Sequence, residues 1–205
     1  MALKNGIFCL ETGWTSSVKD TNSVRPILEL IDRQTGCKHI YHNCATRDEV
    51  AFMLKKWKTK AVQNNFPILY FAFHGKKGSI KLNNDKNGIS LEELADMLEG
   101  ACTNKVFFFA SCDTLDIPDI RAQAFLSKTG AIAAIGYKST VDWMMATAFE
   151  LLVLDKLQQD FFDTRGITAI KTEIETDFRS LGKKLKSIII INNKHFPRKR
   201  TVSKL

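Results

Sequence analysis

Two stretches of the sequence decide the fold, Pro67–Gly75 (PILYFAFHG) and Val106–Asp113 (VFFFASCD). Each contains a run of apolar residues without a polar face, and such runs are typical of strands buried on both sides in the centre of a parallel sheet. A third run, Ala131–Tyr137 (AIAAIGY), has the same character, and GIFCL at residues 6–10 predicts a further buried strand. We therefore expect these strands to be neighbours in one mainly parallel sheet.

Helical patterns separate the strands. Thr46 with Glu49, and Ser90 with Glu93, have the spacing of capping boxes, in which the two side chains bond the first free backbone N–H groups of a helix. Gly130 stands where a helix must stop before the third strand. Regular alternation of strand and helix predicts a three-layer α/β fold, with a mainly parallel central sheet and helices on both faces.

The last part of the chain begins with two predicted helices. Residues 142–158 are largely apolar, and residues 167–185 have apolar side chains at helical spacing. The segment at 188–193 (IIIINN) fits either a last strand or the end of the second helix. We assign residues 1–193 to one domain and residues 194–205 to a basic C-terminal tail.

The net charge of +8 is concentrated at the C-terminus. Residues 178–205 hold nine Lys and Arg and no Asp or Glu, whereas the rest of the chain has 21 basic and 22 acidic residues. A charge run at a terminus is more often solvated than bound to phosphate, so the composition disfavours a nucleic-acid partner. If the tail did bind nucleic acid, that binding would weaken steeply with salt.

The remaining composition predicts a cytoplasmic protein without a membrane partner. The chain has no run of 18 apolar residues, and its N-terminal segment MALKNGIFCLETGW lacks the pattern of a secretory signal. The five cysteines are odd in number and irregularly spaced, which argues against disulfides. The group Cys37, His39, His42 and Cys44 does not predict a zinc site, because these residues would divide between the two faces of a strand. We expect no metal and no cofactor.

A histidine and a cysteine follow two of the buried strands. His74–Gly75 comes directly after ILYFAF, and Cys112 comes after VFFFAS. The carboxyl ends of parallel strands meet at one edge of a sheet, where ligands bind in such folds. A thiol is mostly protonated at neutral pH and needs a neighbouring base, so this pair suits nucleophilic catalysis. The backbone N–H groups of Gly75 and Cys112 are candidates for the oxyanion hole.

The order of these motifs resembles that of the caspase-like cysteine peptidases, above all the CHAT branch, which groups caspases with separase-like domains. The likeness covers about residues 66–154 and rests on LYFAFHGKKGSI, GISLEELADML, VFFFASCDTL, FLSKTGAIAAIGY and STVDW. It implies a caspase-like fold, with His74 and Cys112 as a catalytic dyad in a small stand-alone bacterial peptidase. The Gln-Ala-Cys-x-Gly motif of caspases is absent, and the two residues are closer in sequence than the roughly 50 residues of caspases, so cleavage after aspartate does not follow.

Three acidic residues are candidates for substrate binding. The resemblance implies that an acidic residue in the turn after the third strand lines the primary specificity pocket, and Asp142 stands in that turn. A carboxylate there would favour Arg or Lys through charge-assisted hydrogen bonds. Asp142 equally suits the N-cap of the helix that begins at Trp143, and both interpretations stay open. Glu11 and Asp113 are weaker candidates for the same pocket.

The sequence thus predicts a cysteine endopeptidase that acts on a protein or peptide and cleaves after Arg or Lys. No sensor domain is recognisable, so we expect an activating protein or small ligand to control it. The resemblance implies an effector role in bacterial defence or programmed cell death. The alternative is an inactive caspase-like module that binds a protein partner, which the presence of both His74 and Cys112 disfavours.

Overall fold

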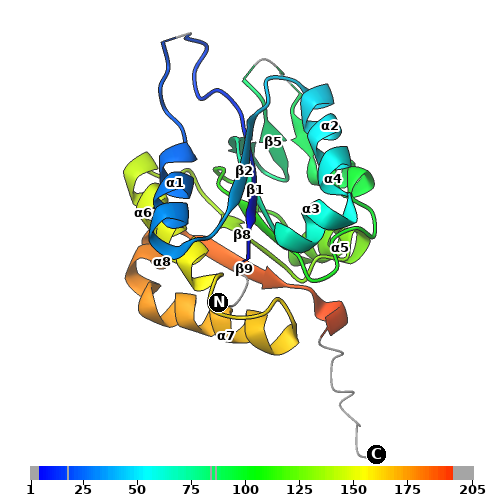
Figure 1. Ribbon diagram of the computed structural model, residues 1–205, viewed down its shortest axis with the longest axis vertical. Helices are drawn as coiled ribbons and strands as arrows, with labels where there is room; N and C mark the ends of the chain where they lie inside the picture. Colours follow the sequence, from blue (N-terminus) through cyan, green and yellow to red (C-terminus); the bar gives the residue numbers. More distant parts are fainter. Residues whose placement is uncertain (1–4, 18, 84, 86, 196–205) are drawn as a thin grey trace, which may run out of the picture.

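The computed structural model describes residues 5–17, 19–83, 85 and 87–195 of the 205. Its centre is a six-stranded sheet (Figure 1). In spatial order the strands are β2 (His39–Asn43), β1 (Ile7–Glu11), β3 (Ile68–Ala72), β7 (Val106–Phe109), β8 (Ala133–Tyr137) and β9 (Ser187–Ile191). The first five strands are parallel, and β9 runs antiparallel to β8. The predicted mainly parallel sheet is confirmed.

Helices cover both faces of this sheet (Figure 1). One face carries α1 (Arg25–Thr35), α6 (Trp143–Lys156), α7 (Thr164–Asp177) and α8 (Arg179–Leu185). The other carries α2 (Arg47–Trp57), α3 (Lys60–Asn65), α4 (Leu91–Met97) and α5 (Asp119–Thr129). The three-layer arrangement predicted from the alternation of strands and helices is therefore confirmed.

Side chains of the central strands alternate between two hydrophobic cores. Tyr70 and Phe108 face the side of α1 and α6, whereas Phe71, Phe107 and Phe109 face the side of α4 and α5. The rings of Phe71 and Phe109 stack with their centroids 5.6 Å apart. All five side chains are at most 1% exposed. Because both faces of these strands are buried, neither strand has a polar face in the sequence.

Capping residues set several helix boundaries as predicted. The side chains of Thr46 and Ser90 each accept the backbone N–H three residues on, and a glutamate returns the bond in both capping boxes. Gly130 ends α5 in the left-handed conformation, with φ at +81°. Glycine adopts this conformation without a steric penalty, which explains its place at the end of the helix.

The C-terminal segment that the sequence left open forms strand β9. The predicted second helix is interrupted at Phe178, which separates α7 from α8. Lys186 then ends α8 in the left-handed conformation, and the isoleucine run pairs with β8. Residues 196–205 of the predicted basic tail lie outside the described residues, and the described part ends with a 3₁₀ turn at Asn193–His195. Within the described ranges, no helix is both long and apolar enough to cross a membrane.

A small antiparallel sheet leaves the end of β3. It consists of β4 (His74–Lys76), β5 (Ser79–Lys81) and β6 (Ile89–Ser90). Strands β5 and β6 are connected through the turn at 83–88, of which residues 84 and 86 are not described. The strand β4 was not expected, and its first residue is His74. The histidine is therefore placed where the chain turns out of the central sheet.

Candidate active site

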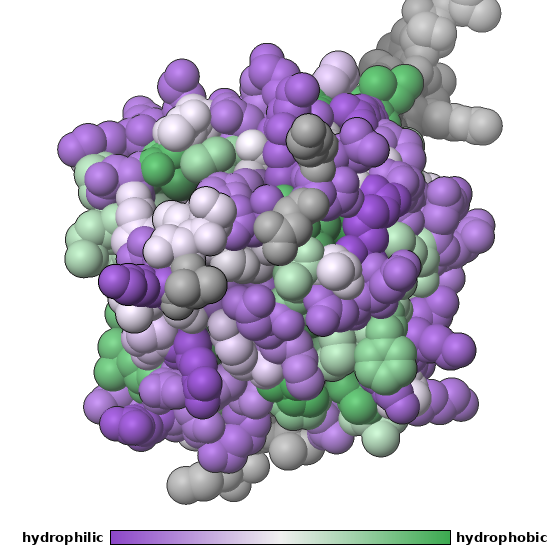
Figure 2. Space-filling model, turned by 90° about the horizontal axis from the view of Figure 1, so that it is seen from above, coloured by the Kyte–Doolittle hydropathy of each residue, from purple (hydrophilic) through white to green (hydrophobic). Residues whose placement is uncertain are grey.

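Four neighbouring strands supply residues to one site at the carboxyl edge of the sheet. Trp14 comes after β1, His74 after β3, Cys112 after β7 and Val141 after β8, and these four strands are adjacent in the order β1-β3-β7-β8. Figure 2, seen from above Figure 1, looks onto this edge, whose surface is mostly hydrophilic with small apolar patches. The parallel order of the strands thus brings together residues that are far apart in the sequence.

Gly75 lets the loop after β3 pack directly on the loop after β7. A Cβ atom at Gly75 would overlap the carbonyl oxygen of Cys112 and would lie 2.7 Å from Thr114 Oγ1. Only a residue without a side chain allows two backbones to approach so closely. His74 and Cys112 therefore lie on loops that contact each other. Cys112 takes part in this contact, and His74 is the residue directly before Gly75.

The loop that carries Cys112 is held from both sides. The Gly78 N–H donates to the Thr114 carbonyl (3.1 Å), and the Asp113 N–H donates to the Ser139 carbonyl (3.2 Å). Asp113 has φ at +55°, in the left-handed region that side chains disfavour. Such a conformation persists where the surroundings hold it, and here the two cross-loop hydrogen bonds do so. Cys112 is thereby fixed at the end of β7.

Cys112 differs from the four other cysteines. Its side chain is half-buried, and its Sγ accepts a hydrogen bond from the Val141 N–H at 3.5 Å. The buried cysteines are Cys9, Cys37, Cys44 and Cys102. Burial raises the pKa of Cys44 to about 11 and that of Cys102 to about 12, so these thiols are neutral core groups. Among the described residues, Cys112 is thus the cysteine that solvent and a substrate can reach.

The ring of His74 is oriented by Trp14. His74 Nε2 lies 2.8 Å from the Trp14 carbonyl oxygen, and the two rings meet edge to face with centroids 5.3 Å apart. A carbonyl oxygen only accepts hydrogen bonds, so Nε2 carries the proton and donates. In the neutral ring, Nδ1 then holds the free lone pair and is the nitrogen able to act as a base. The backbone carbonyl of Trp14 thus orients the ring of His74.

The predicted oxyanion donors lie together at the contact between the two loops. Gly75 is opposite Ile80 in the β4–β5 ladder, and its backbone packs on Cys112. The Cys112 N–H donates no hydrogen bond to the part of the chain that is described. This donor is therefore open to a ligand, as an oxyanion hole requires.

A pocket of about 70 Å³ adjoins Cys112. Its walls are mainly apolar and come from the segments that follow β1, β7 and β8, from the start of α1 and from α6: Trp14, Val24, Ala110, Val141, Trp143 and Ala146. The rings of Trp14 and Trp143 meet edge to face with centroids 4.6 Å apart. The pocket also contains one ionisable side chain besides Cys112, the carboxyl group of Glu150.

Glu150 joins the pocket to the core of the sheet. It projects from α6, is 4% exposed, and accepts hydrogen bonds from Tyr70 (2.5 Å) and Tyr137 (3.0 Å). Burial raises the pKa of Glu150 to about 7, against the opposing effect of the two tyrosine donors. A carboxyl group of this kind beside a candidate nucleophile is a feature of functional sites.

Glu11, one of the residues predicted to bind substrate, organises the loop after β1. Its side chain is 1% exposed, and it accepts hydrogen bonds from four neutral donors. These are Trp14 Nε1 (2.6 Å), Ser23 Oγ (2.6 Å), Val24 N (2.8 Å) and Tyr41 Oη (2.6 Å). Glu11 therefore positions two walls of the pocket, Trp14 and Val24, and is itself behind them.

Asp142 and Asp113 both have local structural partners. The Asp142 carboxylate accepts the Met145 N–H at 2.9 Å, so Asp142 is the N-cap of α6, one of the two interpretations that the sequence left open. Its neighbours Val141 and Trp143 line the pocket. Asp113 accepts a hydrogen bond from Thr140 Oγ1 at 3.3 Å, across the two loops. Neither aspartate is among the residues that line the pocket beside Cys112.

Two residues of the site were not found from the sequence. Trp14 follows β1 in the same way that His74 follows β3, so reading the end of the first strand would have pointed to it. Glu150 is a single acidic residue within the apolar stretch FELLVL of α6, which was the available signal. Both side chains owe their function to packing against strands that are distant in sequence.

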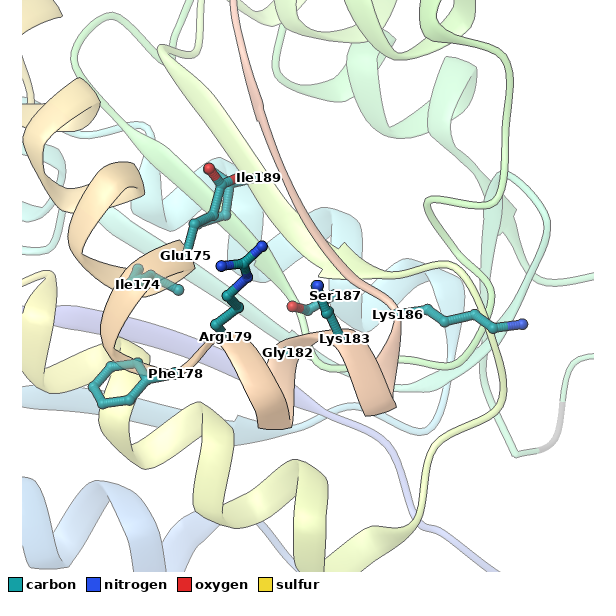
Figure 3. A pocket seen from close by; sticks show the side chains of 9 residues that line it. All are labelled: Ile174, Glu175, Phe178, Arg179, Gly182, Lys183, Lys186, Ser187 and Ile189. Atoms are coloured by element: carbon teal, nitrogen blue, oxygen red, sulfur yellow. The ribbon is translucent and has the colours of Figure 1, made fainter.

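A larger hollow of about 440 Å³ lies elsewhere, between α7, α8 and β9 (Figure 3). Its polar lining includes Glu175, Arg179, Lys183 and Ser187. In Figure 3, Arg179 rises from α8 beside Glu175, so charges of both signs face the hollow. The lining contains neither cysteine nor histidine, and nothing in it resembles the chemistry at Cys112.

Comparison with known proteins places this chain in one family. The model of a family of unknown function, DUF6642, matches residues 4–190, and the chain belongs to that family. A search of curated proteins finds no match. Among the described residues, no group of three or more His, Cys, Asp or Glu side chains is arranged to hold a metal ion.

Proposed function

We propose that this protein is a cysteine peptidase in which Cys112 is the nucleophile and His74 the general base and acid. The observation that carries the proposal is the packing of Gly75 on the Cys112 carbonyl, which joins the loops of the two residues at the carboxyl edge of the sheet. The half-buried thiol, the oriented imidazole and the adjoining pocket support the same conclusion. The caspase-like resemblance is consistent with it.

In the proposed acylation step, His74 Nδ1 takes the proton of the Cys112 thiol while Sγ bonds to the carbonyl carbon of the peptide. The resulting oxyanion accepts hydrogen bonds from the N–H groups of Cys112 and Gly75. The imidazolium then gives its proton to the amide nitrogen, the C–N bond breaks, and the amine leaves. The Trp14 carbonyl, which accepts the Nε2 proton, keeps the ring in the orientation for both transfers.

Deacylation uses the same groups. His74 Nδ1 takes a proton from water, the hydroxide oxygen bonds to the acyl carbon, and the C–S bond breaks as the proton returns to the sulfur. The pocket beside Cys112 would receive the side chain that precedes the scissile bond, for which we propose Arg or Lys. An activating protein or small ligand and a role in bacterial defence or programmed cell death remain part of this proposal.

The competing function is that of an inactive caspase-like module that binds a protein partner. Such a module has no physical need for an oriented imidazole or for an unbonded N–H next to a partly accessible thiol. Its surface would instead recognise a partner without any covalent step. The peptidase is the better-supported function because the oriented imidazole of His74 and the thiol of Cys112 are on loops that contact each other through Gly75.

Covalent labelling tests the proposal. We expect a peptide with a Lys or Arg next to an electrophilic ketone to modify Cys112, with the adduct located by mass spectrometry. Cys112→Ala should abolish the adduct, and Cys44→Ala is the matched control, because Cys44 is a buried thiol of the same chain. Labelling that is absent, or that is equal on the Cys112→Ala variant, would contradict the peptidase.

A further inference from the structure

Two buried carboxyl groups stand at the Cys112 pocket without a cationic partner in the described residues. Glu150 lines the pocket and is bonded by two tyrosine hydroxyls. Glu11 lies behind the pocket wall and is bonded by four neutral donors. The ion pairs of the described chain include neither glutamate. Among the described residues, no Lys or Arg lines this pocket.

Buried carboxylates in proteins normally have a counter-charge, because removing an isolated charge from water is costly. Glu150 has no such counter-charge among the described residues. Burial raises its pKa to about 7, and the nearby Glu11 also acts to raise it. A cation that entered the pocket would reverse this effect by pairing with the ionised form. The pocket therefore has an unmet electrostatic requirement that a ligand can satisfy.

The shape and walls of the pocket limit which cation fits. The volume of about 70 Å³ holds several water molecules but is about half that of a cavity which accepts a benzene ring, so a slender unbranched chain fits better than a ring. The indole rings of Trp14 and Trp143 form part of the wall, and aromatic faces attract ammonium and guanidinium groups. A chain of methylenes ending in a cation matches both the apolar walls and the carboxyl group.

We propose that Glu150 determines the specificity of the Cys112 pocket by binding the cation of a Lys or Arg side chain that precedes the scissile bond. This inference rests on the proposed peptidase function and adds the residue that selects the substrate. It assigns that role to a buried side chain of α6, whereas Asp142 at the start of the same helix serves as its N-cap. Glu150 contacts the substrate side chain, not the reacting atoms.

The proposal predicts a pH dependence for the preference. The ionisable groups near Glu150 come from four strands of the sheet or their ends: Cys9 and Glu11 of β1, Tyr70 of β3, Cys112 after β7, which lines the same pocket, and Tyr137 of β8. Burial raises the pKa of Cys9, Tyr70 and Tyr137, so these three stay neutral. Below pH 7 a cation must displace a proton from Glu150, and its binding should weaken about tenfold per pH unit.

The experiment compares two electrophilic peptide probes that differ only in one side chain, Lys in one and norleucine in the other. Norleucine has the same number of side-chain carbons and no charge. The ratio of the two labelling rates cancels the ionisation of Cys112 and His74, because both probes require the same dyad. We expect the ratio to favour Lys by at least tenfold at pH 8 and to fall as the pH is lowered through 7. An arginine and citrulline pair tests the guanidinium in the same way.

Glu150→Gln keeps the shape of the side chain and its capacity to accept a tyrosine hydrogen bond, but it removes the charge. In this variant the ratio should approach one and lose its pH dependence, while norleucine labelling persists and reports an intact fold. Asp155→Asn, on the exposed far end of α6, is the matched control and should keep the wild-type ratio. An unchanged ratio in Glu150→Gln would overturn the specificity role and leave the peptidase standing. Failure of both probes on the wild-type protein would instead overturn the peptidase itself.

Discussion

The two ends of the same central strands are built differently. At the amino ends, backbone hydrogen bonds join neighbouring segments: Gly6 N–H to the Asn65 carbonyl (3.0 Å), Val106 N–H to the Pro67 carbonyl (3.1 Å) and Ile132 N–H to the Lys105 carbonyl (3.0 Å). At the carboxyl ends, the loops also meet through chemically active groups, such as the contact of His74 with Trp14 and of Cys112 with Val141. The amino ends of the strands are therefore held by backbone hydrogen bonds, and the carboxyl ends carry a thiol, an imidazole and the pocket beside them.

This difference separates stability from chemistry along one set of strands. The connections that leave the carboxyl ends of parallel strands run to helices on one face of the sheet or the other. Ligand sites form in the crevice between such connections. At the amino ends, the strand starts are bonded to the segments that precede neighbouring strands. Substitutions at the amino edge should thus alter the free energy of unfolding, and those at the carboxyl edge should alter reactivity.

The largest expected effect is at the histidine. His74→Ala removes the base and should slow labelling of Cys112 by about 10²- to 10⁴-fold, the usual contribution of a positioned general base. The melting temperature should change little, because His74 is exposed. His42→Ala is the control, since His42 is also exposed and lies near the carboxyl end of a strand, on β2. Equal labelling rates for the two variants would remove His74 from the site.

A pair of glycines tests the separation directly. Neither Gly6 at the amino edge nor Gly75 at the carboxyl edge has room for a Cβ atom, which would overlap the Asn65 or the Cys112 carbonyl oxygen. Each alanine variant should lose about 1–3 kcal/mol of unfolding free energy through overpacking. Only Gly75→Ala should also slow labelling, by tenfold or more, because it displaces Cys112. Denaturant unfolding and labelling rates together measure both effects, and slow labelling in a folded Gly6→Ala variant would contradict the separation.

The smallest expected effect is at Asp142, which lies at the carboxyl edge but has a structural role. Asp142→Ala should cost about 0.5–2 kcal/mol of unfolding free energy, because the Met145 N–H loses its acceptor. Asp142→Asn should be close to wild type in stability, since Asn is an equally good N-cap. Neither variant should change the ratio of Lys to norleucine labelling. A lowered ratio in a stable Asp142→Asn variant would return the specificity role to Asp142.

Local sequence patterns were sufficient for much of the fold. The apolar runs at 67–73 and 106–110, the two capping boxes and Gly130 located strands and helix ends, because each depends on neighbours within a few residues. Regular strand–helix alternation then determined the parallel sheet and its three layers. The positions of His74 and Cys112 at strand ends followed from the same patterns.

Only the tertiary structure decided the rest of the candidate site. The IIIINN segment became β9 because β8 offered an unpaired edge, which no local pattern records. The roles of Trp14 and Glu150 depend on partners 60 and 80 residues away, His74 and Tyr70. Local patterns could therefore point to these two residues but could not give their roles. Glu11 and Asp142 were interpreted from charge and position alone, but an acidic side chain beside a site can bind substrate or hold the walls in place. Burial and hydrogen-bond partners distinguish these roles, and both are set by how the distant strands pack.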